Sequence, residues 1–292
     1  MISTDLLLDV TPSLGLGEPA NVAATLHCPA ALPEGPVDLL FAVHGGGYRR
    51  SYWHPVFADE TYSFARWFTD RGKAVLAIDM VGMGESSRPE PERRLSRAGI
   101  AAAHASALNQ VIERLGRPVN VTGIGHSMGG MMLITQAAAH PAFDRIAVLG
   151  WANEPMVLGD SDAGVLHAGL PSSGYISTPR EAMRALFYAP DVPLHIIEAD
   201  EAQGSATPAT LGRDALTPGI VHDAARIIEV PVLIVQSEVD TSPNPEREIP
   251  YFSSSPDVEL QIVEQAGHCQ NFAGSRVKHW EMLEEWMQRT RP

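Results

Sequence analysis

A serine lies between two glycines in residues 125–129, which read GHSMG and follow an apolar, β-branched run. A serine hydroxyl can attack a carbonyl carbon, but it is a weak nucleophile unless a neighbouring base takes its proton. The G-x-S-x-G pattern is typical of a sharp turn from a strand into a helix, which exposes the hydroxyl. Residues 119–122 read as the strand and residues 127–139 as the helix that this turn requires. We therefore predict that Ser127 is a catalytic nucleophile.

The base and the acid that such a serine needs are expected after strands, further along the chain. Among the eleven histidines, His268 stands in a short loop between the last predicted strand and the final predicted helix. Open α/β sheets present their ligand-facing residues in loops of this kind. Asp240, just past another predicted strand, is the preferred acid. Glu238 in the same turn and Glu154 after an earlier strand remain alternatives.

A glycine cluster with the sequence HGGG, residues 44–47, follows the predicted strand at 37–43. Acyl transfer places negative charge on the carbonyl oxygen, and fixed backbone N–H groups stabilise that charge. The N–H of Met128, at the start of a helix, is one expected donor, and the helix dipole favours negative charge there. We predict that Gly46 supplies the second donor, with Gly47 as the alternative.

Glycine-rich turns also bind nucleotides, and three glycine clusters of this chain follow predicted strands. A dinucleotide fingerprint needs G-x-G-x-x-G, with an acidic residue about 20 positions later. The clusters that begin at Gly45, Gly82 and Gly123 all lack the third glycine, and the sequence has no G-x-x-x-x-G-K-[ST] motif. A nucleotide-binding function is therefore not supported.

Aromatic residues near the expected site have two interpretations that the sequence does not separate. Tyr48 and Trp53 follow the glycine cluster, and Phe187 lies in the middle of the chain. They could line a substrate pocket, or they could pack into the core. We carry all three forward as expected pocket residues.

The elements that would position these groups alternate along the chain. Six short apolar runs predict strands at residues 37–43, 74–78, 119–122, 146–149, 232–235 and 258–263. Helical periodicity appears at residues 57–70, 99–115, 127–139 and 276–288. Most of the strand runs are almost continuously apolar, as in parallel strands that are buried on both faces. The alternation predicts an α/β fold.

The regular alternation stops between residues 151 and 228, where Gly, Pro, Ser and Asp cluster around short helical pieces. An insertion of this length between two strands of one sheet is more typical of a cap than of a set of long loops. We therefore expect a core formed by residues 1–150 and 229–292, with residues 151–228 as an inserted cap.

Composition narrows the range of partners and compartments. The net charge of −14 argues against nucleic acid, because few cations are available to neutralise phosphates. Two distant cysteines predict neither a disulfide framework nor a zinc site. The first residues lack the basic and apolar regions of a signal peptide, and no apolar run is long enough to cross a membrane. We expect a cytoplasmic protein without metal or organic cofactor.

Five groups of residues together resemble the α/β-hydrolase superfamily over the chain from about residue 37 onward. They are HGGG at 44–47, DxxGxGxS at 79–86, GHSMGG at 125–130, SEVD at 237–240 and AGH at 266–268. The resemblance implies a mostly parallel eight-stranded sheet flanked by helices, with a cap inserted after the sixth strand. It also implies the triad Ser127, Asp240 and His268, in the chain order of that fold.

Two features limit a finer assignment within the superfamily. The triple glycine is similar to that of the hormone-sensitive-lipase group, which usually has an amino-terminal cap and an Asp where this chain has His126. The GHSMGG sequence and the mid-chain cap look more like the esterase and carbon–carbon hydrolase groups. Epoxide hydrolases and haloalkane dehalogenases use an aspartate nucleophile, so Ser127 argues against both.

The expected function is a serine hydrolase that cleaves a carboxylic ester, a lactone or a related acyl bond through an acyl-enzyme on Ser127. A carbon–carbon bond hydrolase or an acyltransferase could use the same three residues. A ligand-binding receptor that kept the fold and lost turnover is less favoured, because all three positions are filled. The expected partner is a small ester or acyl compound, and assembly into a homodimer is left open.

Overall fold

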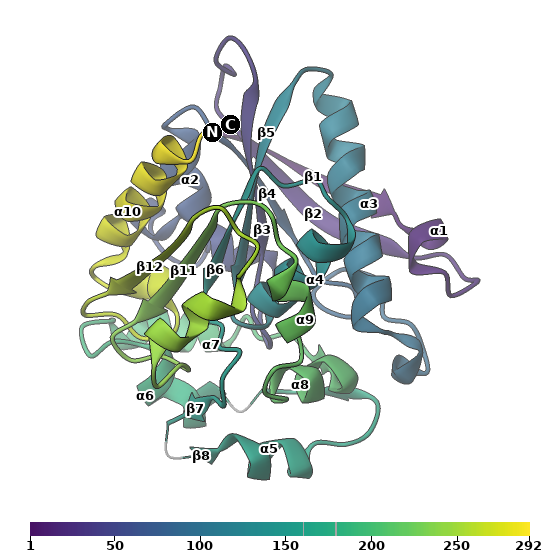
Figure 1. Cartoon of the computed structure of the whole chain (residues 1–292), viewed down its shortest axis with the longest axis vertical. Coiled ribbons are helices and arrows are strands. Elements are labelled where there is room, and N and C mark those ends of the chain that lie inside the picture. Colours follow the sequence, from purple (N-terminus) through teal and green to yellow (C-terminus); the bar gives the residue numbers. More distant parts are fainter. Residues whose placement is uncertain (160, 179) are drawn as a thin grey trace.

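The computed structural model describes residues 1–159, 161–178 and 180–292 of the chain. An eight-stranded sheet forms its middle layer (Figure 1), in the order β1-β2-β4-β3-β5-β6-β11-β12. The strands are β1 (Ile2–Asp9), β2 (Asn21–Cys28), β3 (Val37–Val43), β4 (Ala74–Ile78), β5 (Val119–His126), β6 (Arg145–Leu149), β11 (Val232–Ser237) and β12 (Val258–Val263). The predicted α/β fold with a mostly parallel eight-stranded sheet is confirmed.

The six strands predicted from apolar runs form the parallel part of the sheet. The two strands that the residue pattern missed, β1 and β2, are antiparallel and lie at one edge. Most of β1 is exposed, because an edge strand on the surface buries little of either face. Its sequence therefore lacks the continuous apolar run that marks a central strand.

Helices cover both faces of the sheet (Figure 1), and β3 shows why. Side chains alternate along a strand, so Leu39 and Phe41 point to one face while Leu40 and Ala42 point to the other. The first pair packs in the cluster that contains apolar residues of α3 (Arg97–Leu115) and α4 (Met128–Ala139). The second pair packs with residues of α2 (Phe64–Thr69) and α10 (Arg276–Arg289).

The helix expected at residues 57–70 begins later than the sequence indicated. Residues Glu60–Tyr62 form a 3₁₀ turn, and α2 starts after Ser63. The Ser63 hydroxyl accepts a hydrogen bond from the Arg66 N–H at 2.9 Å and caps the helix. The remaining short helices of the core are α1 (Thr11–Leu14), η1 (Arg50–Trp53), η3 (Glu92–Arg94), η5 (Pro245–Tyr251) and η6 (Gln270–Phe272).

The chain between β6 and β11 leaves the sheet and forms short elements, most of them in the lower part of Figure 1. They are β7 (Val157–Leu158), β8 (Ser161–Asp162), α5 (Ala163–Gly169), β9 (Tyr175–Ile176), η4 (Arg180–Met183), α6 (Arg184–Phe187), α7 (Leu194–Glu201), β10 (Thr207–Pro208), α8 (Ala209–Ala215) and α9 (His222–Arg226). We call the segment between β6 and β11 the cap. It follows the sixth strand of the main sheet.

A buried carboxylate ties the cap to the core. Glu92, in η3, has no exposed surface. Its two oxygens accept hydrogen bonds from the Gly174 N–H at 3.0 Å and from the Thr210 N–H at 2.9 Å. The Thr210 hydroxyl donates to the same carboxylate. Backbone N–H groups in two segments of the cap thus have a core side chain as their hydrogen-bond acceptor.

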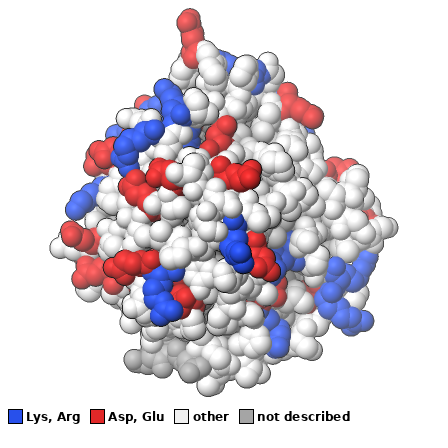
Figure 2. Space-filling view, in the orientation of Figure 1, with Lys and Arg blue, Asp and Glu red and all other residues white. Residues whose placement is uncertain are grey.

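Charged side chains of both signs are interspersed on the face shown in Figure 2. Within the described residues, no helix is long and apolar enough to cross a membrane.

The contacts of Glu92 predict a specific stability effect. Glu92→Ala should lower the free energy of unfolding by about 2–4 kcal/mol, because it leaves two partly buried backbone donors and the Thr210 hydroxyl without their acceptor. Urea denaturation measures this change. Glu18→Ala is the control, since Glu18 pairs with Arg94 while 42% exposed, and it should cost less than about 0.5 kcal/mol. Equal effects of the two substitutions would contradict the prediction.

Candidate active site

Ser127 stands at the turn from β5 into α4 in an uncommon backbone conformation. Its φ is 55° and its ψ is −124°, and it is one of two non-glycine residues with positive φ in the described part of the chain. Such a conformation costs free energy and persists only where the surroundings enforce it. The Ser127 N–H donates to the Leu149 carbonyl at 2.7 Å, which ties the turn to the end of β6.

The glycines on either side of the serine are required by backbone packing. A Cβ atom on Gly125 would lie 2.7 Å from the carbonyl carbon of Gly129. A Cβ atom on Gly129 would lie 2.8 Å from the carbonyl carbon of Val43, in β3. Helix α4 therefore rests directly on the main chain of two strands, as the G-x-S-x-G pattern predicts.

His268 and Asp240, which are 28 positions apart, meet at the carboxyl ends of β11 and β12. The His268 Nδ1 lies 2.6 Å from the Asp240 Oδ1. Their side chains are only 3% and 1% exposed. With Nδ1–H directed to the carboxylate, Nε2 is the ring nitrogen that can accept a proton.

The Asp240 carboxylate is held by three further donors. Its oxygens accept hydrogen bonds from the Thr241 N–H at 2.8 Å, the Ser237 N–H at 2.8 Å and the Gln270 amide at 3.3 Å. Hydrogen bonds to an ionised carboxylate are stronger than those between neutral groups. The orientation of the acid, and through it that of the imidazole, is therefore strongly restrained.

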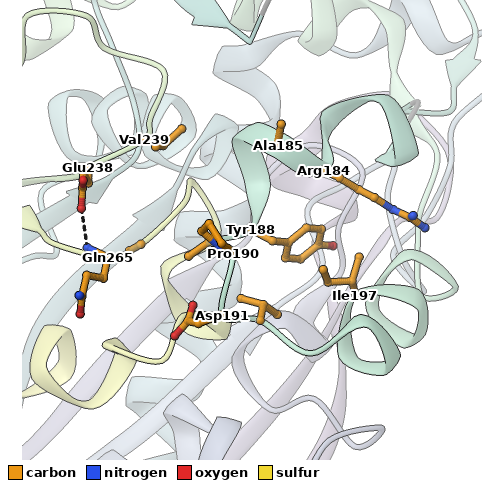
Figure 3. A pocket seen from close by; sticks show the side chains of 12 residues that line it. Arg184, Ala185, Tyr188, Pro190, Asp191, Ile197, Glu238, Val239 and Gln265 are labelled. Atoms are coloured by element: carbon orange, nitrogen blue, oxygen red, sulfur yellow. Dashed lines mark hydrogen bonds between the residues drawn. The ribbon is translucent and has the colours of Figure 1, made fainter.

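The two alternative acids have other partners. Glu238 is exposed, and its Oε2 accepts a hydrogen bond from the Gln265 N–H at 2.8 Å (Figure 3). Glu154 accepts from the Tyr251 hydroxyl at 2.6 Å and pairs with Arg247 at 3.4 Å. Of the three carboxylates, Asp240 is the one that contacts His268.

Gly150 is a site residue that the sequence reasoning missed. It follows β6 directly and has a φ of 62°. A Cβ atom at this position would lie 2.9 Å from both Nδ1 and Cε1 of His268. Because the Leu149 carbonyl binds the Ser127 N–H, this short stretch lies against both the serine turn and the imidazole. The available signal in the sequence was that Gly150 directly follows the predicted strand at residues 146–149. In the structure this strand pairs with β5, which ends at the serine turn.

His126 links the turn at Ser127 to the loop that carries His268. We call this loop, residues 264–269 between β12 and η6, the histidine loop. Its Nε2 lies 2.8 Å from the carbonyl oxygen of His268, and its ring stacks on Tyr52 with centroids 4.7 Å apart. Burial holds the pKa of His126 well below its usual value, so the ring is neutral near pH 7. A neutral ring that donates from Nε2 fixes the backbone of the residue that carries the imidazole.

Residues 44–47, which we call the glycine loop, are oriented by the hydrogen bonds of their carbonyl groups. The Gly45 carbonyl accepts from the His44 Nδ1–H at 2.8 Å and from the Tyr48 N–H at 3.3 Å. In a trans peptide the C=O and the next N–H point in opposite directions, so the Gly46 N–H is turned away from the His44 ring. A Cβ atom on Gly46 would lie 3.5 Å from the end of the Met128 side chain.

The two expected donors of this loop differ in their partners. The Gly47 N–H donates to the Thr207 hydroxyl of the cap at 2.9 Å. This hydrogen bond favours Gly46 over Gly47 as a donor to a bound molecule. The N–H of Met128 opens α4, where the first N–H groups have no carbonyl partner within the helix.

The expected pocket residues occupy three different environments. The Phe187 ring lies 5.4 Å from the His268 ring, measured between centroids. Tyr48 is buried, and its hydroxyl binds cap residues. Trp53 has no exposed surface and packs between Tyr52 and Phe64 in the core, so its position does not support a role in a pocket.

A cavity of about 740 Å³ lies between the cap and the turns after β11 and β12. Figure 3 shows Tyr188 and Ile197 of the cap on one side and Glu238, Val239 and Gln265 on the other. Its lining includes sequence neighbours of Asp240 and His268 rather than Ser127 itself. The cavity thus lies next to the histidine loop and is not bounded by the serine.

The pattern of the α/β-hydrolase family matches residues 39–277, and the chain belongs to this family. An esterase from Thermogutta terrifontis has a similar structure, with a TM-score of 0.68 and 16% identity over 99% of this chain and 100% of that one. A proline iminopeptidase from Mycobacterium smegmatis gives 0.67 and 17% identity over 98% of each chain. E-2-(Acetamidomethylene)succinate hydrolase gives 0.62 and 17% identity over 98% of this chain and 100% of that one. No curated protein matches the sequence significantly.

The packing of Gly150 gives a test of the histidine's position. Gly150→Ala should destabilise the fold by about 1–3 kcal/mol more than Gly116→Ala, because the new methyl group must displace His268. The two glycines have nearly equal φ values of 62° and 64°, and Gly116 has open space around it. Both variants therefore carry a similar backbone strain. The difference between their free energies of unfolding, measured by chemical denaturation, reports the clash with His268. Equal losses would show that the imidazole accommodates the methyl group.

Proposed function

We propose that the chain is a serine hydrolase that cleaves a carboxylic ester, a lactone or a related acyl bond through an acyl-enzyme on Ser127. The observation that carries the proposal is the buried hydrogen bond between Asp240 and His268. The backbone of His268 is bound by His126, the residue before the serine that is held at positive φ. A serine, an imidazole and a carboxylate in this order make the hydroxyl nucleophilic near pH 7. The esterase among the similar structures is consistent with this chemistry.

In the first half of the reaction, the Ser127 oxygen forms a bond to the substrate carbonyl carbon. The hydroxyl proton passes to His268 Nε2, and Asp240 stabilises the resulting imidazolium. The carbonyl oxygen takes the negative charge and accepts hydrogen bonds from the N–H groups of Met128 and Gly46. When the tetrahedral species collapses, the leaving group departs with the proton from His268.

In the second half, a water molecule attacks the acyl-enzyme and loses its proton to His268. The tetrahedral species again places its charge at the same two N–H groups. Collapse returns the proton from His268 to the Ser127 oxygen and releases the acid. The scheme needs no group beyond the chain, the small-molecule substrate and water. Transfer of the acyl group to another acceptor, or cleavage of a carbon–carbon bond, would use the same residues with a different second reactant or substrate.

Labelling of the serine tests the proposal directly. A fluorophosphonate probe should form a covalent adduct on Ser127 in the folded protein and no adduct in Ser127→Ala, because phosphonylation requires an activated hydroxyl. Intact-protein and peptide mass spectrometry locate the adduct. Hydrolysis of p-nitrophenyl acetate should be lost in the same variant. A folded parent protein that remains unlabelled would overturn the proposed function.

The acid assignment has its own test. Asp240→Asn should lower kcat by about 10³- to 10⁴-fold, because the amide cannot stabilise the imidazolium and favours the wrong tautomer. Glu238→Gln and Glu154→Gln are matched controls, since both carboxylates have partners other than His268. They should change kcat by less than about threefold. A large loss in either control with a small loss in Asp240→Asn would reassign the acid.

A further inference from the structure

The cap binds both peptide groups of Gly47, the residue next to the proposed oxyanion donor. The Gly47 N–H donates to the Thr207 hydroxyl at 2.9 Å, and its carbonyl accepts from the Ser205 N–H at 2.9 Å. Arg180 Nη1 lies 3.5 Å from the same carbonyl. A Cβ atom on Gly47 would lie 3.0 Å from the Cβ of Thr178, so the loop is pressed against the cap.

A buried ion pair lies directly behind these contacts. Arg180, in η4, pairs with Asp200, in α7, and their side chains are 7% and 2% exposed. The Arg180 guanidinium also donates to the Tyr48 hydroxyl at 2.6 Å and lies over the Tyr48 ring at 4.0 Å. Asp200 accepts from the Tyr48 hydroxyl at 2.9 Å. The residue after Gly47 is therefore held by both partners of the pair.

The same network reaches the histidine loop. The Tyr48 hydroxyl lies 3.0 Å from the sulfur of Cys269, the residue after His268. The N–H groups of His268 and Cys269 donate to the carbonyls of Leu186 and Phe187, in α6, at 2.8 and 2.9 Å. A Cβ atom on Gly267 would lie 2.8 Å from the Phe187 carbonyl. The cap thus contacts both loops that bear proposed catalytic groups.

General stabilisation is a weak explanation for such a pair. Removing two charges from water costs several kcal/mol per ion, and apolar residues of similar size often stabilise a fold as well or better. Burial raises the pKa of Asp200, and the attraction of Arg180 opposes this rise. The pair instead fixes the position of Tyr48, because both charged groups bind the Tyr48 hydroxyl.

We propose that Arg180, Asp200 and Thr207 are positioning residues, which hold the Gly46–Gly47 loop so that the Gly46 N–H faces the developing oxyanion. The proposal rests on the proposed function of Ser127 and adds the cap to the machinery of that site. None of the three residues needs to touch the substrate. They act through Gly47 and Tyr48, and a small displacement of the donor weakens its interaction with the transition state.

Removal of one charge tests the ion pair. Asp200→Asn should lower kcat for p-nitrophenyl acetate by about 10- to 100-fold, with KM changed by less than about threefold, because the loop acts on the transition state. Glu201→Gln is the matched control: Glu201 is the next residue in α7 and pairs with Arg184 of the cap at 2.6 Å. It should leave kcat within about twofold of the parent value.

Thr207 provides a second, independent pair of variants. Thr207→Val preserves the shape but removes the hydroxyl that accepts from Gly47, so kcat should fall by about 10-fold or more. Thr207→Ser restores the hydroxyl and should return kcat to within about threefold of the parent value. If Asp200→Asn does not fold, this pair decides the question.

Hydrogen exchange of the peptide that spans residues 44–53 tests the positioning of the loop independently of catalysis by Ser127. Exchange should be faster in Asp200→Asn and Thr207→Val, and unchanged in Glu201→Gln, because only the first two variants free the loop. An unlabelled Ser127 in the parent protein would refute the proposed function, while exchange would still report on the loop. Folded variants with parental kcat, or an equal loss in Glu201→Gln, would overturn the positioning role.

Discussion

The direct contact of α4 with the main chain of β3 and β5 is the constraint on which the site depends. At Gly125 and Gly129 there is no room for a Cβ atom, so helix and strands meet backbone to backbone. This close approach forces Ser127 to positive φ at the end of the strand. It also places the first N–H groups of α4 at the carboxyl edge of the sheet, beside the glycine loop that continues from β3. The position of the proposed nucleophile and the direction of the α4 dipole thus have one steric origin.

The loops around this contact are connected through buried polar side chains. His126 binds the backbone of His268, Asp240 binds its ring, and Gly150 leaves the space that the ring occupies. Buried hydrogen bonds of this kind are costly to leave unmade, so each of them restrains the others. Low sequence identity with similar structures is compatible with the shared fold, because the fold requires packing patterns more than particular residues.

The cap is bound to the core through many directional contacts. Glu92 accepts hydrogen bonds from the cap backbone, while the carbonyls of Leu186 and Phe187 accept hydrogen bonds from the histidine loop. Arg180 and Asp200 both bind the Tyr48 hydroxyl. A cap that is attached in this way differs from a lid that closes only over substrate. It contacts both the glycine loop and the histidine loop, which carry the proposed reactive groups.

The sequence by itself determined the features that depend on local sterics and on burial of neighbouring residues. Central strands appeared as continuous apolar runs, and the serine turn appeared through its glycines. Asp240 was the preferred partner of His268 because both follow predicted strands. The cap partners of Gly47 and Arg180, and the contacts of His268 with His126 and Gly150, could not be determined in this way, because they come from distant segments that only the packed sheet and cap bring together. Trp53 illustrates the same limit: an aromatic residue after a strand has one local pattern whether it lines a pocket or fills the core. Tertiary packing decided between these environments, since burial depends on all the surrounding elements and not on the neighbours in the chain.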